Sequence, residues 1–415
     1  MRHDRLSNLD SAVDLCSATG NSFCAMRKIA LMLLFVTGLA VFNHLQAQDL
    51  AARSDQPGSF AEAVKEHFSE WDRNGDGRLS VGEVNDALAN PNVKNESAAA
   101  IVAIEKVIRG HKYKLPPLTT DYLVASPLKE NAESDEEAES ADDDSKAATF
   151  NHPPSFQRRY ENALKKLQNS APELFPQSLP VFSVTHQGEL GDCPFVSTVG
   201  AMVYRNPADI KAMFQQNHDR SFVVTFGNGS VVRIAHLTDA DIAMWSSAGT
   251  NGLWLTVLEK AYRKSLVQTK GQGSIYDKFG SGHTVEILSG HSIRKVELKE
   301  FKAGSLKLVS LRTALENARN ERLLMKTGTP GEGSGNAKRL PPHVPHDHAF
   351  AILGFDGKTD LVQVWNPGGN HFTPKGPDGL HNGYTTKDGV FFVPLKEFVE
   401  IFDVVNFETK TRTLE

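Results

Sequence analysis

The segment from Lys129 to Lys146 constrains the folding of this chain more than any other stretch. It is dominated by Glu, Asp, Ser and Ala, and it contains no aromatic residue. Such a composition cannot bury enough apolar surface to offset the conformational entropy that is lost on ordering. We therefore predict that residues 129–148 form an acidic disordered linker, with a smaller folded region before it and a larger one after it.

The beginning of the chain has the pattern of an export signal. Arg27 and Lys28 precede an apolar run over residues 29–42, and Leu45-Gln46-Ala47 follows, which places the small residue Ala47 before Gln48. A signal peptide combines these features. A membrane anchor is the alternative, but the run is shorter than the roughly 20 residues of a spanning helix. We predict that residues 1–47 are an N-terminal extension and signal peptide, that the mature protein is exported (periplasmic or secreted), and that no stable membrane span remains after cleavage.

Beyond residue 150, helix and strand patterns are mixed. The helices mostly precede the strands, which favours an α+β domain with two halves that face each other. We expect helices over 194–204 and 251–265, and strands over 222–226, 231–234, 348–353 and 361–365. The formal net charge of −5 gives no basic surface for nucleic acid, so we expect no nucleic-acid partner.

Residues 72–83 have the spacing of a calcium-binding loop. The expected ligands are Asp72, Asn74, Asp76, the carbonyl of Arg78, Ser80 through water, and bidentate Glu83. Gly77 permits the sharp turn, and helical patterns flank the loop, so the segment resembles an EF-hand. We predict a small α-helical EF-hand domain over residues 55–125 with calcium as its cofactor, and a degenerate partner loop around residues 113–121. A solvated polar turn is the alternative.

Cys193 is a candidate nucleophile. Signal cleavage would leave it as the single cysteine, because the other two are Cys16 and Cys24. It stands where a glycine-rich turn meets a predicted helix, and Pro194 suits the first turn of a helix. A helix N-terminus or a nearby imidazolium lowers the pKa of a thiol. The side-chain amide of Gln187 could join the Cys193 backbone N–H in holding a developing oxyanion.

A base and an orienting residue are also available. His348 begins one predicted strand, and Asn366 directly follows another. If the two strands are neighbours, the Asn366 carboxamide can fix the imidazole so that one ring nitrogen faces the thiol.

These residues belong to an ordered set that resembles the calpain cysteine peptidases, whose fold is related to that of papain. The similarity runs from about residue 179 to residue 407, through Gln187-Gly188-Glu189-Leu190-Gly191-Asp192-Cys193, Trp254 to Tyr262, Gly280 to Gly290, His348-Ala349-Phe350, Asn366-Pro367 and Asp388 to Phe392. The resemblance implies a two-lobed papain-like peptidase domain over residues 150–415 that cleaves protein or peptide substrates. It also implies Cys193 as nucleophile, His348 as general base and then acid, Asn366 as orienting residue and Gln187 as oxyanion donor.

The chain departs from that family at three places. Pro194 and Gly368 stand where the family has tryptophans, which removes part of the expected shield around the His–Asn pair, although Trp365 could shield it from the other side. Val390 replaces an acidic residue two positions after Asp388, which weakens the expectation of calcium activation within the peptidase core.

Other functions are compatible with parts of the pattern. One is a calcium-binding protein that recognises peptides without cleaving them, and another is a papain-like acyltransferase that passes the acyl group to an amine. A zinc site formed by His343, His346, Asp347 and His348 is a further alternative.

Overall fold

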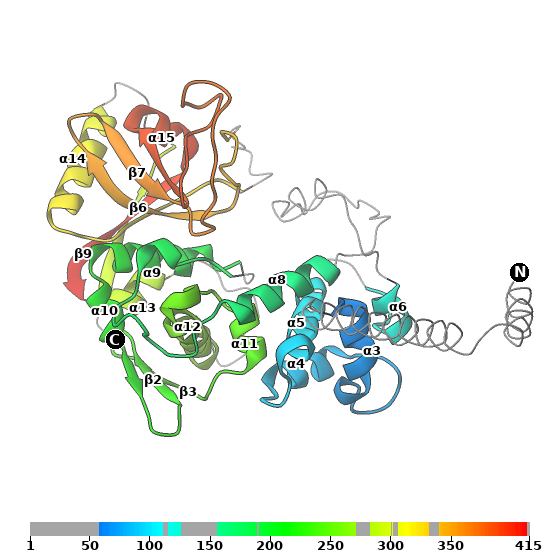
Figure 1. Cartoon of the computed structure of the whole chain (residues 1–415). Helices are drawn as coiled ribbons and strands as arrows, with labels where there is room; N and C mark the ends of the chain where they lie inside the picture. The colour runs from blue at the N-terminus through cyan, green and yellow to red at the C-terminus, as the bar shows by residue number, and fades with distance from the viewer. Residues whose placement is uncertain are drawn as a thin grey trace, which may run out of the picture. The chain divides into compact units, whose positions relative to one another are not determined.

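The computed structural model describes residues 58–110, 115–125, 156–188, 191–270, 283–299, 301, 306–331 and 340–412 (Figure 1). The predicted signal peptide, Cys16, Cys24 and the acidic linker lie outside these residues. From Ser59 onward the chain forms one compact unit.

A helical region comes first in the described chain. It contains α3 (Phe60–Trp71), α4 (Val81–Ala89), α5 (Asn95–Gly110) and α6 (Thr120–Val124). Ser59 starts α3 because its side chain accepts the backbone N–H of Glu62, whose carboxylate accepts the Ser59 N–H in return. The apolar residues that repeat at helical spacing in α3 are the ones that become buried.

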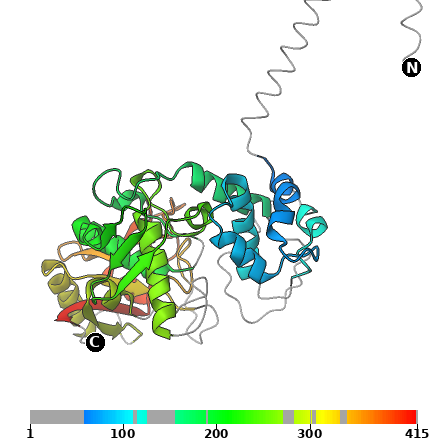
Figure 2. The ribbon, with the colours of Figure 1, turned by 90° about the horizontal axis from the view of Figure 1, so that it is seen from below.

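The core of this region also contains side chains from beyond the acidic segment. α8 (Phe156–Gln168) packs along α5, and Phe156 stacks on Phe60 with ring centroids 5.0 Å apart. α11 (Asp239–Met244) contacts α5 as well, and Trp245 at its end is fully buried in the same core. Figures 1 and 2 both show teal α8 beside the blue and cyan helices.

The next region is rich in helices. Its elements are η2 (Phe182–Val184), α9 (Cys193–Arg205), α10 (Pro207–Lys211), β1 (Phe214–Gln216), β2 (Phe222–Thr225), β3 (Val231–Ile234), η3 (Gly249–Asn251), α12 (Trp254–Lys270) and α13 (Thr284–Ser289). The predicted helices appear as α9 and α12, and the first two predicted strands as β2 and β3, with shifts of a few residues at their ends. β1, β2 and β3 form a small antiparallel sheet.

The C-terminal region is a six-stranded antiparallel sheet with two helices. The strands are β4 (His291–Glu297), β5 (Met325–Gly328), β6 (Ala349–Asp356), β7 (Leu361–Trp365), β8 (Val390–Pro394) and β9 (Val404–Arg412), and the helices are α14 (Leu306–Asn320) and α15 (Leu395–Ile401). The strand order is β4-β9-β5-β6-β7-β8. β6 and β7 are neighbours, as predicted, with Ala351 opposite Trp365.

The two faces of this sheet are covered differently. α9 packs on β5 and β6, where Ala351 and Trp365 join the core of the helix-rich region. α14 and α15 cover a second core that includes Phe350 and Phe398. The mixed helix and sheet content agrees with the predicted α+β class. The sheet thus meets α9 through β5 and β6, and β6 begins directly after His348.

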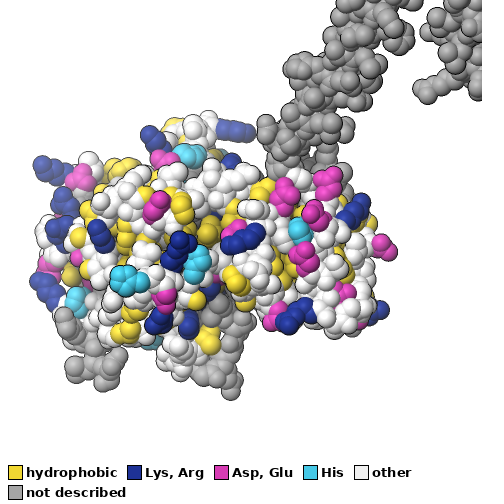
Figure 3. Space-filling view, turned by 60° about the horizontal axis from the view of Figure 1, so that its bottom comes forward, with side chains coloured by type: hydrophobic (Ala, Val, Ile, Leu, Met, Phe, Trp, Pro, Cys, Tyr) yellow, Lys and Arg dark blue, Asp and Glu magenta, His cyan; other side chains and the backbone are white. Residues whose placement is uncertain are grey.

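The described surface and helices give two further observations. On the face drawn in Figure 3, Lys and Arg side chains are interspersed with Asp and Glu. Among the described helices, none combines the length and the apolar character that crossing a membrane requires.

Candidate active site

Cys193 is the first residue of α9. The chain enters the helix through Gly191, whose positive φ of 62° favours glycine, and through the N-cap residue Asp192. Pro194 lies in the first turn, where a missing N–H leaves no intrahelical bond unmade. The thiol is buried, and its Sγ accepts a hydrogen bond from the backbone N–H of Ala349 at 3.4 Å. This contact places the sulfur beside the start of β6.

His348 and Asn366 meet at the adjacent ends of β6 and β7. The His348 Nε2 lies 2.9 Å from the Asn366 Oδ1, which also accepts the Gly368 N–H at 2.9 Å. Because an amide oxygen only accepts, Nε2 carries the ring proton and Nδ1 keeps its lone pair. The ring nitrogen that can take a proton from a thiol is therefore the one that Asn366 leaves free.

Gln187 is held near the same strand ends by its backbone. Its N–H donates to the Pro367 carbonyl at 2.9 Å, one residue after Asn366. Within the described part of the chain, its half-buried side chain has no hydrogen-bond partner for Oε1. At least one hydrogen-bonding position of the Gln187 amide, the Oε1 acceptor, is therefore unoccupied among the described residues. The following Glu189 and Leu190 lie outside the described residues.

A family model described as calpain family cysteine protease matches residues 157–408, which is more than half of the chain. The chain belongs to the calpain family of cysteine proteases. The match spans all four residues that we predicted to be catalytic, and it supports thiol peptidase chemistry on protein substrates. No curated protein matches the chain.

Burial dominates the charge state of the thiol and the imidazole in this calpain-family site. It raises the pKa of Cys193 to about 11, whereas the Ala349 N–H and the charge of Lys326 act in the opposite direction. Burial also lowers the pKa of His348 to about 4, against the hydrogen bond that His348 donates to Asn366. Both shifts favour the uncharged pair in the resting site, so the thiolate has to be stabilised by other groups when it forms.

The carboxyl of Asp192 lies one residue before the nucleophile. Burial raises the pKa of this carboxyl well above its usual value, and the nearby charge of Glu259 raises it further, against the charge of Arg263. A negative Asp192 raises the pKa of the Cys193 thiol, and burial opposes that negative form.

Trp365 directly precedes Asn366 and packs against α9. It is fully buried, its indole N–H donates to the Asp388 carbonyl at 3.1 Å, and its ring centroid lies 4.9 Å from that of Phe182. Gly200 of α9 approaches the ring so closely that no side chain fits between them. Shielding of the His–Asn pair by Trp365 stays a prediction.

A short segment connects the loop of Gln187 with the helical core. The Gly188 N–H donates to the Ser246 Oγ at 2.9 Å, and His186 pairs with Ser247 through two backbone hydrogen bonds. These serines directly follow Trp245, which is buried in the core of α3, α5 and α8. The segment that carries Gln187 is therefore bonded to residues that lie only one or two positions after the buried Trp245.

The predicted calcium loop lies between α3 and α4. Asp72 accepts the N–H groups of Gly75 and Gly77, and Glu83 binds the N–H and hydroxyl of Ser80 with one oxygen and the N–H groups of residues 73 and 74 with the other. Asn74 and Asp76 each accept a backbone N–H two residues further on, at Asp76 and Arg78. The side-chain oxygens are thus turned into the loop and are occupied by backbone donors. The Leu79 N–H donates to the Leu118 carbonyl at 3.0 Å, within the range predicted for a partner loop.

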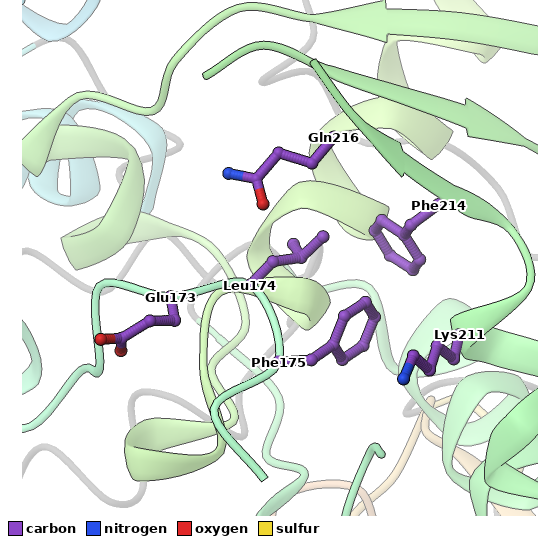
Figure 4. Close-up of a pocket in the computed structure, with 6 residues that line it drawn as sticks. All are labelled: Glu173, Leu174, Phe175, Lys211, Phe214 and Gln216. Carbon is purple, nitrogen blue, oxygen red and sulfur yellow. The ribbon is translucent and has the colours of Figure 1, made fainter. Parts of the chain in front are cut away.

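Other candidate sites have less support. Across the described ranges, no three His, Cys, Asp or Glu side chains gather closely enough to hold a metal ion, and this applies both to His343, His346, Asp347 and His348 and to the loop carboxylates Asp72, Asp76 and Glu83. A hollow of about 360 Å³, shown in Figure 4, is lined by Glu173, Leu174, Phe175, Lys211, Phe214 and Gln216. It shares no residue with the predicted catalytic set.

Proposed function

We propose that the protein is a papain-like, two-lobed thiol endopeptidase in which Cys193, His348 and Asn366 act as a catalytic triad. The observation that carries the proposal is the meeting of three elements at one point. The N-terminus of α9 brings the thiol to the N–H of Ala349, and β6 and β7 bring His348 within 2.9 Å of Asn366.

The reaction follows from the protonation states of these groups. His348 Nδ1 takes the proton of the Cys193 thiol as the sulfur attacks the substrate carbonyl, and the resulting imidazolium donates that proton to the leaving amine. Water then attacks the thioester, His348 accepts a proton from the water, and the acid product leaves with the thiol restored. Asn366 holds the ring throughout, because its Oδ1 accepts from Nε2–H in every step.

The developing oxyanion requires donors near the start of α9. The Cys193 backbone N–H has no intrahelical partner at this position, and the Gln187 amide supplies the second donor. Loss of one such donor typically costs about 3 kcal/mol of transition-state stabilisation. The donor of Gln187 is its Nε2 group, and the structure shows no hydrogen bond between this side chain and another described residue.

Casein turnover tests this function. We expect the purified protein to cleave casein, and the Cys193→Ser and His348→Ala variants to lose turnover while they keep the thermal unfolding midpoint of the parent. An active-site thiol probe should label the folded parent at Cys193, and the label should decrease in His348→Ala. Labelling that is equal in the two proteins, together with no casein cleavage, would contradict the triad.

We also propose that residues 72–83 bind calcium as an EF-hand. The donor set fits a hard cation that prefers oxygen: Asp72, Asn74, Asp76 and Glu83 offer side chains, Arg78 its carbonyl and Ser80 a water-mediated contact. Bound calcium would neutralise this acidic loop in place of the backbone donors that now occupy its oxygens. The Leu79–Leu118 hydrogen bond supports a degenerate second loop as its partner. Calcium titration followed by isothermal calorimetry tests the site, and an absence of binding at millimolar calcium would refute it.

Export through the pattern in residues 1–47 is the third proposal. It rests on the charged start, the short apolar run and the small residue Ala47 before Gln48. N-terminal sequencing of the protein secreted by its host cells tests it, and a mature N-terminus near residue 48 is the expected result.

A further inference from the structure

Lys326 lies in the middle of the large sheet. β5 is flanked by β6 and β9, and Lys326 stands opposite Ala351 on one neighbour and Asn406 on the other. Only 5% of the residue is exposed. Its Nζ donates to the Pro194 carbonyl and to the Thr284 Oγ1, the latter at 2.8 Å. The ammonium group therefore lies directly behind the first turn of α9, which begins at Cys193.

The polar atoms around Lys326 form a small buried network. Thr198 donates its hydroxyl to the same Pro194 carbonyl at 2.8 Å, and the hydroxyls of Thr198 and Thr284 are 3.0 Å apart. All of these groups are neutral. They satisfy hydrogen bonds of the ammonium group, but they supply no negative charge to balance it.

Two other cations whose side chains are partly buried have carboxylate partners. Lys260 pairs with Asp241 at 2.6 Å, and Arg205 pairs with Glu408 at 2.7 Å. Across the described chain, the ion pairs include none with Lys326, and the ionisable group that acts on it is the Cys193 thiol. Burial lowers the pKa of Lys326 to about 7, while a negative sulfur raises it. An unbalanced buried ammonium is costly, so its presence at this position requires a reason.

We propose that Lys326 is a positioning residue for the nucleophile, whose buried ammonium stabilises the Cys193 thiolate from behind the first turn of α9. The proposal rests on the proposed function, because it assigns the counter-charge for the sulfur of that triad. When the thiol proton passes to His348, Cys193 becomes negative and His348 becomes positive. The Lys326 ammonium keeps its own protons and stays positive. The other charged or titratable groups that act on the thiol are Asp192 and Asp347, and both disfavour the thiolate. Lys326 is thus the cation that opposes the effect of burial.

The test measures the thiol rather than peptide cleavage. Iodoacetamide alkylation of the purified full chain is followed between pH 4 and 10 by mass spectrometry of the peptide that contains Cys193. In Lys326→Met, we expect the alkylation rate at pH 6 to fall about tenfold or more, which corresponds to a rise of about one unit in the pKa of the thiol. At pH 6 the parent ammonium is present, because this pH lies below the Lys326 pKa of about 7.

Stability separates this role from a purely structural one. Removing an uncompensated buried charge should raise the thermal unfolding midpoint of Lys326→Met, whereas loss of a structural tether would lower it. Lys260→Met is the matched control: it should lower the midpoint, because it leaves Asp241 without its partner, and should leave the alkylation profile unchanged. An unchanged profile in folded Lys326→Met would overturn the proposal. If that variant does not fold, Lys326→Gln provides the same measurement.

The outcome is distinguishable from a failure of the proposed function. A parent protein whose alkylation depends on Lys326 but which does not cleave casein would refute the peptidase and retain the role of Lys326. A parent that cleaves casein, with an alkylation profile that Lys326→Met does not move, would refute only the role of Lys326.

Discussion

Replacing Gly200 with alanine tests whether the contact between α9 and Trp365 positions the His–Asn pair. A Cβ on Gly200 would lie 2.1, 2.6 and 2.9 Å from three atoms of the Trp365 ring. Ordinary contacts of a Cβ begin at 3.4 Å, so either the ring or the helix has to move by about 1.3 Å (3.4 − 2.1). The ring is rigid, fully buried and fixed by its hydrogen bond to the Asp388 carbonyl.

Two opposing effects set the size of the change. Alanine is better than glycine inside a helix by about 1 kcal/mol, while overpacking a filled core costs about 1–3 kcal/mol and sometimes more. The close approach to three ring atoms places Gly200→Ala at the costly end, and we expect a net loss of about 2 kcal/mol of stability. Trp365 directly precedes Asn366, so a displacement of about 1 Å there should lower kcat/KM by about 100-fold.

Differential scanning calorimetry and casein-peptide kinetics measure the two effects. The matched control is Gly82→Ala in α4, where the nearest atom to the added Cβ is the Ser80 Oγ at 3.7 Å. This variant should be as stable as the parent or more stable by up to about 1 kcal/mol, with unchanged kcat/KM. A Gly200→Ala protein with the stability and kcat/KM of the parent would refute the positioning role of Trp365.

Three further variants test other parts of the structure. Asn366→Ala removes the hydrogen bond to His348. Because loss of a buried hydrogen bond costs about 1–3 kcal/mol, we expect kcat/KM on a peptide substrate to fall by about 10–100-fold. An unchanged kcat/KM would contradict the role of Asn366. Arg205→Met removes a cation that, with hydrogen bonds, holds the pKa of Glu408 below its usual value. The stability that the Glu408 carboxylate contributes is present above pH 4.5 and is lost as the pH falls through its lower folded pKa. In urea unfolding, Arg205→Met should therefore lose about 1–3 kcal/mol of stability at pH 7 and less at pH 3. Equal losses at the two pH values would contradict the role of Arg205. In the parent, calcium at a concentration 100 times its dissociation constant should stabilise the fold by about 2.7 kcal/mol and raise the unfolding midpoint. Glu83→Gln should abolish this rise. A rise that persists in the variant would show that calcium binds elsewhere.

Those parts of the site that could be predicted lie on elements with a strong local pattern. β7 and most of β6 are apolar strands bounded by polar residues, and α9 begins at a turn with Gly and Pro signals, so their ends were predictable from the sequence. The proximity of His348 and Asn366 then followed from one assumption, that the two strands are neighbours. The structure confirms that assumption.

The remaining features depend on contacts between distant parts of the chain. β5 has only four residues and includes Lys326 and Gly328, so it has no alternation by which it could be recognised. Its burial results from pairing with β9, which is near the C-terminus, and no local pattern encodes that pairing. The sequence therefore does not predict the burial of Lys326, and its one local signal is a lone lysine after Leu323-Leu324-Met325.

α8 was missed for a different reason. Phe156, Tyr160, Ala163 and Leu164 follow the i, i+4, i+7, i+8 spacing of a helix with one apolar face, and the structure buries all four. The signal was therefore present in the sequence. Its partner surface on α3 and α5, across the acidic segment, could not be inferred from spacing, because it depends on tertiary packing.

The burial of Trp245 among the N-terminal helices has a consequence for biosynthesis and inheritance. During translation, α3 to α6 leave the ribosome long before α11, so the nascent bundle retains an uncovered apolar side until the tryptophan emerges. A gene fragment that begins after the acidic segment would in turn express α8 and α11 with that side open to solvent, and such a fragment should aggregate. The two regions are therefore expected to pass together through gene rearrangements, since neither can be shuffled into another protein without exposing the surface that the other covers.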